Sequence, residues 1–184
     1  MNSLQELNRT LAEYRVDDNF QDDRLGYRCC ELAMEALNDK CYGVGAVLFD
    51  SGNNILSEGR NEVFLNGFHS GRHAEMIALD NFEKRFPTYT DRCRLTLIVS
   101  LEPCPMCFTR TLFAGIGHLV YLAEDPNGGM VRRLTKMPAV WRNLARLQHS
   151  RQADVSPVLS QLASQIGKFE LAEKRRKLLK TIRA

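Results

Sequence analysis

The sequence predicts an α/β domain in which helices pack on a mixed β-sheet. Short runs of Leu, Ile and Val bounded by turn residues alternate with longer segments whose apolar residues recur at helical intervals. The chain has 184 residues, about one domain's length. With 44% hydrophobic and 26% charged residues, its composition excludes a disordered tail, a collagen and a disulfide-rich miniprotein.

The first third of the chain predicts two helices and a hairpin. Ser3 and Glu6 have the spacing of a capping box, which predicts a helix over residues 4–14. Leu25, Cys29, Leu32, Ala33, Ala36 and Leu37 line one helical face, which predicts a second helix ending near Asn38. The apolar run 43–49 and a second run around 55–56 flank a Ser-Gly-Asn-Asn turn and predict a β-hairpin.

The middle of the chain predicts two buried strands that alternate with helices. Residues 95–99 and 118–122 are rich in Leu, Ile and Val and have the length of strands. The helical segments of this region are residues 74–86 and 105–113. The order helix, hairpin, helix, strand, helix, strand indicates a layered domain with a mixed sheet.

The C-terminal part has a different composition. Beyond the turn at residues 126–129, helical patterns cover residues 139–149 and 158–169, and no strand is predicted. We divide the chain into a main domain, residues 1–130, and a basic helical extension, residues 131–184. About 55 residues are few for an independent core, so we expect the extension to pack on the same domain.

Charge is distributed unevenly between these two parts. Residues 1–130 hold 12 Lys and Arg against 19 Asp and Glu, whereas residues 131–184 hold 13 against 3. The run Lys174-Arg175-Arg176-Lys177 concentrates this positive charge and predicts contact with a polyanion such as RNA. A solvated helical face, or pairing with the acidic part, remains the alternative.

Cysteine usage and the N-terminal residues predict a cytoplasmic protein. The first residues carry acids from Glu6 onward and no apolar core of a signal peptide, and no stretch has the ~20 apolar residues of a membrane span. We therefore expect reduced thiols. Only Cys104 and Cys107 have the spacing of metal ligands, and the other four are predicted to be buried small apolar residues: Cys29, Cys30, Cys41 and Cys93.

Two short motifs carry the chemistry. His73-Ala74-Glu75 opens one predicted helix and Pro103-Cys104-Pro105-Met106-Cys107 opens another. One imidazole and two thiolates make a tetrahedral Zn²⁺ site with three protein ligands, which leaves a position for water. Zinc lowers the pKa of bound water from 15.7 to about 7. Glu75 need not be a ligand and can move the proton of that water, a role worth ~10²–10⁴ in rate.

The pair H-x-E and P-C-x-x-C is the signature of zinc deaminases. The chain resembles the cytidine deaminase superfamily over about residues 24–126. The resemblance rests on these two motifs and on the segments YGVGAVLFDSGNNILSEGRN, GRHAEMIAL and LTLIVSLEPCPMC. The chain looks most like the branch of bacterial tRNA adenosine deaminases and guanine deaminases. The resemblance implies a three-layer α/β/α sandwich with a mixed five-stranded sheet, and a homodimer.

The resemblance also implies roles for individual residues. The zinc ligands fall on His73, Cys104 and Cys107, and the proton shuttle falls on Glu75. The substrate-contacting asparagine falls on Asn61, and the backbone N–H of Ala74 would meet the base. The implied reaction is hydrolytic loss of ammonia from an aminopurine or aminopyrimidine.

Four alternatives stay open. His69 and His73 could close a structural Cys₂His₂ zinc site with the two cysteines, and Asn61 could be a plain turn residue. The first substrate choice is adenosine in RNA, with the tRNA wobble position as the expected target, and a free base or nucleoside (guanine, cytosine or cytidine) is the alternative. A non-enzyme alternative is an inactive, zinc-stabilised RNA-binding module.

Overall fold

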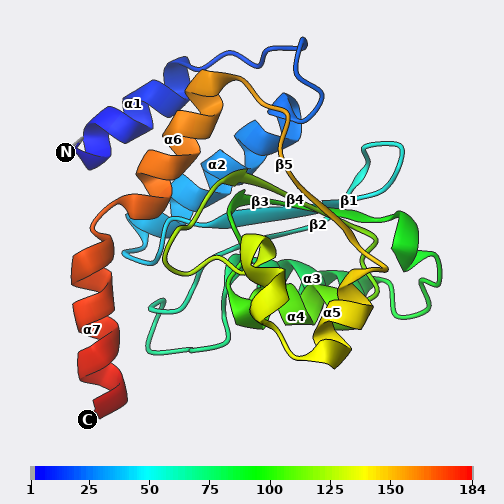
Figure 1. The fold of residues 1–184 in the computed structure, drawn as a ribbon. Coiled ribbons are helices and arrows are strands. Elements are labelled where there is room, and N and C mark those ends of the chain that lie inside the picture. The colour runs from blue at the N-terminus through cyan, green and yellow to red at the C-terminus, as the bar shows by residue number, and fades with distance from the viewer. Residues whose placement is uncertain (1–2, 184) are drawn as a thin grey trace.

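The computed structural model describes residues 3–183 and contains one mixed sheet flanked by helices (Figure 1). The strand order is β2-β1-β3-β4-β5, with β1 antiparallel to β2 and β3, and with β3, β4 and β5 mutually parallel. The strands are β1 Gly45–Phe49, β2 Ile55–Arg60, β3 Thr96–Leu101, β4 His118–Ala123 and β5 His149–Gln152. The helices are α1 Leu4–Glu13, α2 Asp23–Asn38, α3 Ala74–Arg85, α4 Pro105–Phe113, α5 Ala139–Ala145, α6 Pro157–Lys168 and α7 Leu171–Arg183, with 3₁₀ turns η1 Arg92–Arg94 and η2 Val131–Lys136.

The sheet separates two apolar cores, which confirms the predicted three-layer sandwich. Helices α1, α2 and α6 cover one face, and α3, α4 and α5 lie on the other (Figure 1). Alternate residues of β1 point to opposite faces, as in any strand, so Val47 joins the α2–α6 core and Leu48 joins the α3–α4 core. Every residue of β1 is buried, because this strand lies inside the sheet and between both layers.

A close approach between α3 and β2 places the functional helix. A Cβ atom on Gly59 would lie 2.2 Å from the carbonyl oxygen of Ala74, so only glycine fits this position of β2. The first turn of α3 therefore rests directly on the backbone of the edge strand.

The prediction that the C-terminal part contains no strand is wrong. Helix α5 ends at Ala145 instead of continuing to 149, and His149–Gln152 forms β5, parallel to β4. Main-chain bonds hold it: the His149 N–H donates to the Gly117 carbonyl and the Ala153 N–H to the Tyr121 carbonyl, both at 2.8 Å. The strand lies at the sheet edge and its sequence, HSRQ, is polar, so it carries no apolar alternation by which it could be recognised.

Helix α6 completes the core on the α2 side. Its residues Leu159, Leu162 and Ile166 are buried, and Pro157 begins the helix behind an N-cap serine, whose hydroxyl accepts from the Leu159 N–H. Residues 149–168 thus add both a strand to the sheet and a helix to its core.

The cysteines are free thiols in this structure. Cys29, Cys30 and Cys41 are buried, as predicted, whereas Cys93 is exposed. Cys93 lies in η1, a short turn without buried residues, so the prediction of burial is wrong there. Among residues 3–183, no helix combines the length and the apolar character that crossing a membrane requires.

Candidate active site

Two helix N-termini meet at the site. His73 is the N-cap of α3 and Cys104 is the N-cap of α4, and both have extended backbone conformations. Pro105 stands at the first helical position of α4, where its missing N–H costs no hydrogen bond. Cys104 follows closely on β3, so the site lies outside the carboxyl end of a central strand, where open α/β sheets bind their ligands.

The three predicted ligands are gathered at the spacing of a zinc site. The Nδ1 atom of His73 lies 3.7 Å from Sγ of Cys104 and 3.5 Å from Sγ of Cys107, and all three ligand atoms lie within 4.8 Å of one another. A tetrahedral ion with Zn–N and Zn–S bonds of ordinary length separates nitrogen from sulfur by about 3.6 Å. The residues present therefore fit zinc. His69 is not part of this group and lies exposed in the preceding loop, which argues against the Cys₂His₂ alternative.

The hydrogen bond between the Cys104 and Cys107 thiols favours deprotonation of Cys104. It lowers the pKa of Cys104 to about 4, with a further contribution from His73. The pKa of Cys107 is raised by the same hydrogen bond and by burial. Burial by itself would lower the pKa of His73, but the hydrogen bond with Cys104 raises it overall. At neutral pH the pair thus holds a thiolate, the form that binds metal.

Glu75 is the buried carboxyl group next to this ligand set. It lies in the first turn of α3, is 3% exposed and lines the same cavity as His73 and Cys104. Burial raises its pKa above the ordinary value of glutamic acid, and the nearby Cys104 raises it further. A raised pKa lies closer to neutral pH, so the carboxyl group can both take and return a proton there.

Asn61 is buried at the end of β2 and also lines the cavity. Its Oδ1 accepts from the Val63 N–H at 3.1 Å and its own N–H donates to the Val44 carbonyl at 2.9 Å. Both bonds hold the residue in place and leave its amide Nδ2 as the group that can contact a ligand. Ala74 is buried at the first position of α3, where a helical N–H has no partner within the helix.

The cavity has a volume of about 210 Å³ and its walls come from distant parts of the chain. Besides the residues above, it is lined by Tyr42 and Val44, by the ends of β3 and β4, and by the α6–α7 segment. Sequence reasoning missed the following lining residues: Tyr42, Val44, Leu101, Glu102, Glu124, Asp125, Gly167, Lys168, Leu171 and Leu178. The sequence Pro126-Asn127-Gly128-Gly129 predicts a turn next to Asp125, but nothing local connects this turn to the site.

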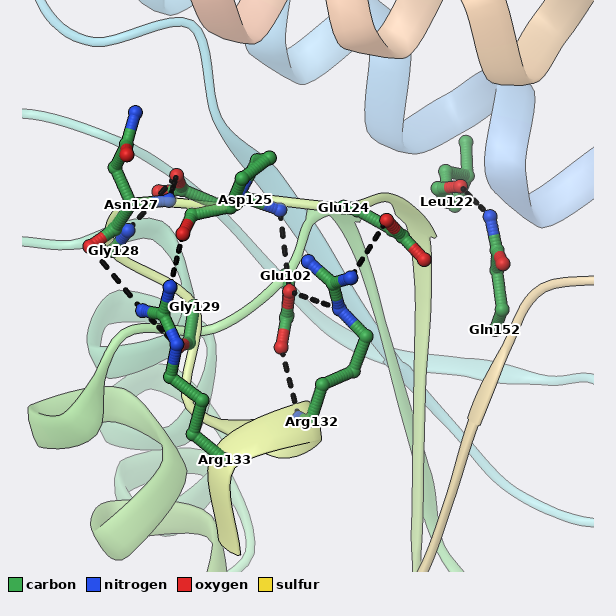
Figure 2. Close-up of polar contacts among 11 residues, drawn as sticks. Glu102, Leu122, Glu124, Asp125, Asn127, Gly128, Gly129, Arg132, Arg133 and Gln152 are labelled. Carbon is green, nitrogen blue, oxygen red and sulfur yellow. Dashed lines mark hydrogen bonds and ion pairs between the residues drawn. The ribbon is translucent and has the colours of Figure 1, made fainter. Parts of the chain in front are cut away.

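Glu102 holds the loop that follows β4 (Figure 2). Its side chain is 1% exposed, and its two oxygens accept from the Asp125 N–H at 3.2 Å, the Arg132 N–H at 3.0 Å and Arg132 Nε at 3.1 Å. Arg132 also pairs with Glu124 at 2.7 Å. A Cβ atom on Gly129 would lie 2.3 Å from the Glu102 carboxyl group, so glycine is required there. One buried carboxylate thus ties the loop of residues 124–132 to the strand that leads into Cys104.

We expect Glu102→Gln to destabilise the fold. One oxygen becomes an NH₂ group, so donors that now share a carboxylate lose an acceptor, at a cost of about 1–3 kcal/mol in the free energy of unfolding. Urea denaturation measures the change. Glu124→Gln is the control, because Glu124 is exposed and its ion pair with Arg132 is expected to contribute less than about 1 kcal/mol. Equal effects of the two substitutions would contradict the assigned role.

Three of the four basic residues predicted to contact a polyanion, Lys174, Arg176 and Lys177, line one groove, whereas Arg175 lines the cavity. Lys174 is 6% exposed, and its Nζ donates to the Phe169 carbonyl at 3.1 Å and pairs with Glu170 at 3.5 Å. Its ammonium group is therefore bound by groups within the protein. The Lys177 ammonium lies 4.2 Å from the centre of the Phe64 ring, Arg176 is exposed, and Arg175 lines the cavity.

Known proteins are similar to this chain in sequence over part of their length. It is 38% identical over 119 residues to a tRNA-specific adenosine deaminase of Haemophilus influenzae, which covers 64% of this chain and 66% of that protein. It is 40% identical over 99 residues to a tRNA(Ile)-lysidine synthase of Deinococcus radiodurans, covering 53% of this chain and 16% of that protein. The chain thus spans less than two thirds of the length of these relatives.

A solved structure agrees with the architecture. A guanine deaminase from Nitrosomonas europaea superposes with a TM-score of 0.62 at 24% identity, over 88% of this chain and 91% of that one. The sequence profile of the cytidine and deoxycytidylate deaminase zinc-binding region matches residues 20–123, more than half of the chain, and this range includes all three ligands and Glu75. The protein therefore belongs to the cytidine and deoxycytidylate deaminase family.

Proposed function

We propose that the protein is a zinc-dependent hydrolytic deaminase that converts adenosine in RNA to inosine. One observation carries the reaction class: a buried carboxyl group, Glu75, lines the same cavity as His73 and Cys104, which with Cys107 form a metal-type set of three ligands that would leave a fourth coordination position free. A closed structural zinc site has no use for such a carboxyl group, which argues against an inactive RNA-binding module. The six free thiols are consistent with the predicted cytoplasmic location.

Different residues of the site would bind the metal ion and transfer the protons. His73, Cys104 and Cys107 would hold the ion. When bound, zinc supplies Lewis-acid chemistry that lowers the pKa of water to about 7. Glu75 takes a proton from the attacking water and delivers it to a ring nitrogen, and it then takes the proton of the new hydroxyl group on the ring carbon and delivers it to the amine. The carbon–nitrogen bond breaks, ammonia leaves, and a carbonyl group remains on the ring.

Two residues are suited to hold the base. The side-chain oxygen of Asn61 accepts from the Val63 N–H, and its backbone N–H donates to the Val44 carbonyl. A donor on a residue held in this way orients a ligand at little entropic cost. The N–H of Ala74 is a second donor, because it begins α3. We propose that these two groups orient the base so that its amine-bearing carbon faces the ligand set.

The choice of RNA rests on two supports. Relatives of the chain include tRNA-specific adenosine deaminases, and the basic helix α7 contributes to the wall of the cavity. An RNA base would have to leave its stack to enter this cavity. A free base or nucleoside is the second candidate, because a guanine deaminase shares the fold and α7 partly covers the cavity with Leu171 and Leu178.

A panel assay decides between these substrates. Ammonia release from the zinc-loaded protein is measured with tRNA, an anticodon stem-loop, nucleotides, nucleosides and free bases, and products are identified by mass. We expect inosine formation in RNA. Release from free guanine or cytosine alone would select the second candidate, and no release from any compound would refute the deaminase proposal.

We further propose a homodimer whose contact includes an apolar patch on α4 and α5. Met106 and Phe113 on α4, Val140 on α5 and Leu147 just beyond it are exposed, and Phe113 is 72% exposed despite its contact with Trp141. Such a patch favours burial against a partner surface. Its position beside the zinc-type ligands on α4 agrees with the homodimer that the family resemblance implies.

Phe113→Lys is therefore expected to shift the protein toward monomer at micromolar concentration, because burying an unpaired ammonium group in the contact is unfavourable. Light scattering measures the mass. Val158→Lys is the control, since Val158 is also exposed but lies on α6, on the other side of the sheet. A wild-type monomer, or equal effects of both substitutions, would contradict the proposed contact.

A further inference from the structure

Two arginines lie at or beside the cavity, and they differ in their partners. Arg132 pairs with Glu102 and Glu124, so its charge is compensated within the protein. Arg175 lines the cavity from α7, yet no carboxylate oxygen of residues 3–183 lies within 4.0 Å of its guanidinium group. Arg175 is therefore an exposed cation at the cavity that has no carboxylate partner among the described residues.

A second cation lies on the same wall. Lys168, at the end of α6, also lines the cavity, and within residues 3–183 its Nζ donates only to the Ser164 hydroxyl, at 2.8 Å. Arg175 is close enough to Tyr42, another wall residue, for its charge to oppose the burial that raises the pKa of this tyrosine. The α6–α7 wall is thus basic and solvent-facing.

The acidic groups of the cavity belong to other walls. Glu102 and Glu124 are paired with Arg132, and Asp125 Oδ1 accepts from the backbone N–H groups of Asn127 and Gly128 at 3.0 and 2.9 Å. Neither cation of the α6–α7 wall is paired with them. An anion at this wall would therefore not compete with an existing ion pair.

Helix α7 is held in place by groups other than Arg175. The buried Lys174 ammonium bonds to the Phe169 carbonyl, the Tyr42 hydroxyl donates to the Lys174 carbonyl at 3.4 Å, and Lys177 lies over the Phe64 ring. These contacts fix the helix across the cavity, and the guanidinium group of Arg175 is not needed for them.

We propose that Arg175, assisted by Lys168, is a phosphate subsite beside the base cavity, so that the substrate is a nucleobase carried on a phosphate-bearing sugar. Guanidinium groups bind phosphate through paired, charge-assisted hydrogen bonds, and a cation without a carboxylate partner is free to do so. The phosphate belongs either to a free nucleotide or to an RNA chain. This inference rests on the proposed deaminase function and assigns its substrate class.

The test compares Arg175→Gln with Arg183→Gln, an exposed arginine farther along the same helix. kcat/KM is measured for the base identified by the ammonia panel, presented as nucleoside, as 5′- and 3′-monophosphate and in an RNA stem-loop. We compare kcat/KM for the phosphate-bearing substrates with kcat/KM for the nucleoside. We expect Arg175→Gln to reduce this ratio by about tenfold or more, mainly because KM for the phosphate-bearing substrates rises. Arg175→Lys should restore part of it, and Arg183→Gln should leave it within about twofold.

Comparison of the monophosphates with the RNA stem-loop identifies the source of the phosphate. An effect on both monophosphates and RNA indicates a nucleotide subsite, and an effect on RNA alone indicates the RNA backbone. An unchanged ratio in Arg175→Gln, including an equal loss with every substrate, would overturn the inference and leave Arg175 a structural residue.

A binding measurement separates this inference from the proposed reaction. If the wild-type protein deaminates nothing, the proposed function fails, and calorimetry with inosine and inosine 5′-monophosphate then tests the subsite alone. Tighter binding of the monophosphate that Arg175→Gln removes would support the subsite. Equal binding of the two compounds, or binding of neither, would refute it.

Discussion

Glu75→Gln is expected to remove most turnover while the metal stays bound. Glutamine has the shape of glutamate but cannot take a proton from water or return it to the leaving amine, so kcat should fall by about 10²–10⁴. The substitution preserves the volume of a side chain that is 3% exposed at the start of α3. Steady-state ammonia release and zinc analysis of the same sample measure both consequences.

The control for this substitution is Glu83→Gln on the same helix. Glu83 is partly exposed and pairs with Arg92 and Arg110, away from the cavity wall. It should keep near wild-type turnover. If Glu75→Gln lost its zinc, Glu75 would be a ligand rather than a proton carrier, and turnover close to wild type would refute its catalytic role.

Cys107→Ala is expected to abolish both zinc binding and turnover. Cys107 is fully buried in the first turn of α4, and its sulfur lies 3.5 Å from His73 Nδ1, so its loss leaves two residues of the three-residue ligand set. Zinc content should fall from one ion per chain to near zero. Because metal binding stabilises only the folded state, the unfolding temperature should fall as well.

Two further variants make this prediction specific. Cys93→Ala removes an exposed cysteine outside the site and should leave zinc content unchanged. His69→Ala tests the structural-zinc alternative directly and should also leave one ion per chain, since His69 lies outside the ligand group. Zinc retained by Cys107→Ala, or lost from His69→Ala, would show that the ligand set is different.

The chemical centre could be predicted from short segments, because each ligand lies at or next to the start of a helix that its own sequence encodes. His73 precedes the apolar pattern of α3, and Cys104 precedes Pro105, a residue suited to the first position of a helix. Within each motif the spacing is local, so H-x-E and P-C-x-x-C specify which side chains can share a metal. The capping box of Ser3 and Glu6 is present for the same reason.

Only the tertiary structure decided which residues surround that centre and which basic residues remain accessible. Strand β5 depends on main-chain bonds to β4 rather than on apolar side chains, so its sequence contains no strand pattern. Lys174 is buried and Arg175 lines the cavity although they are neighbours, because successive residues of a helix face different directions. Burial and charge pairing arise from contacts between segments far apart in the chain, and local sequence patterns do not encode them.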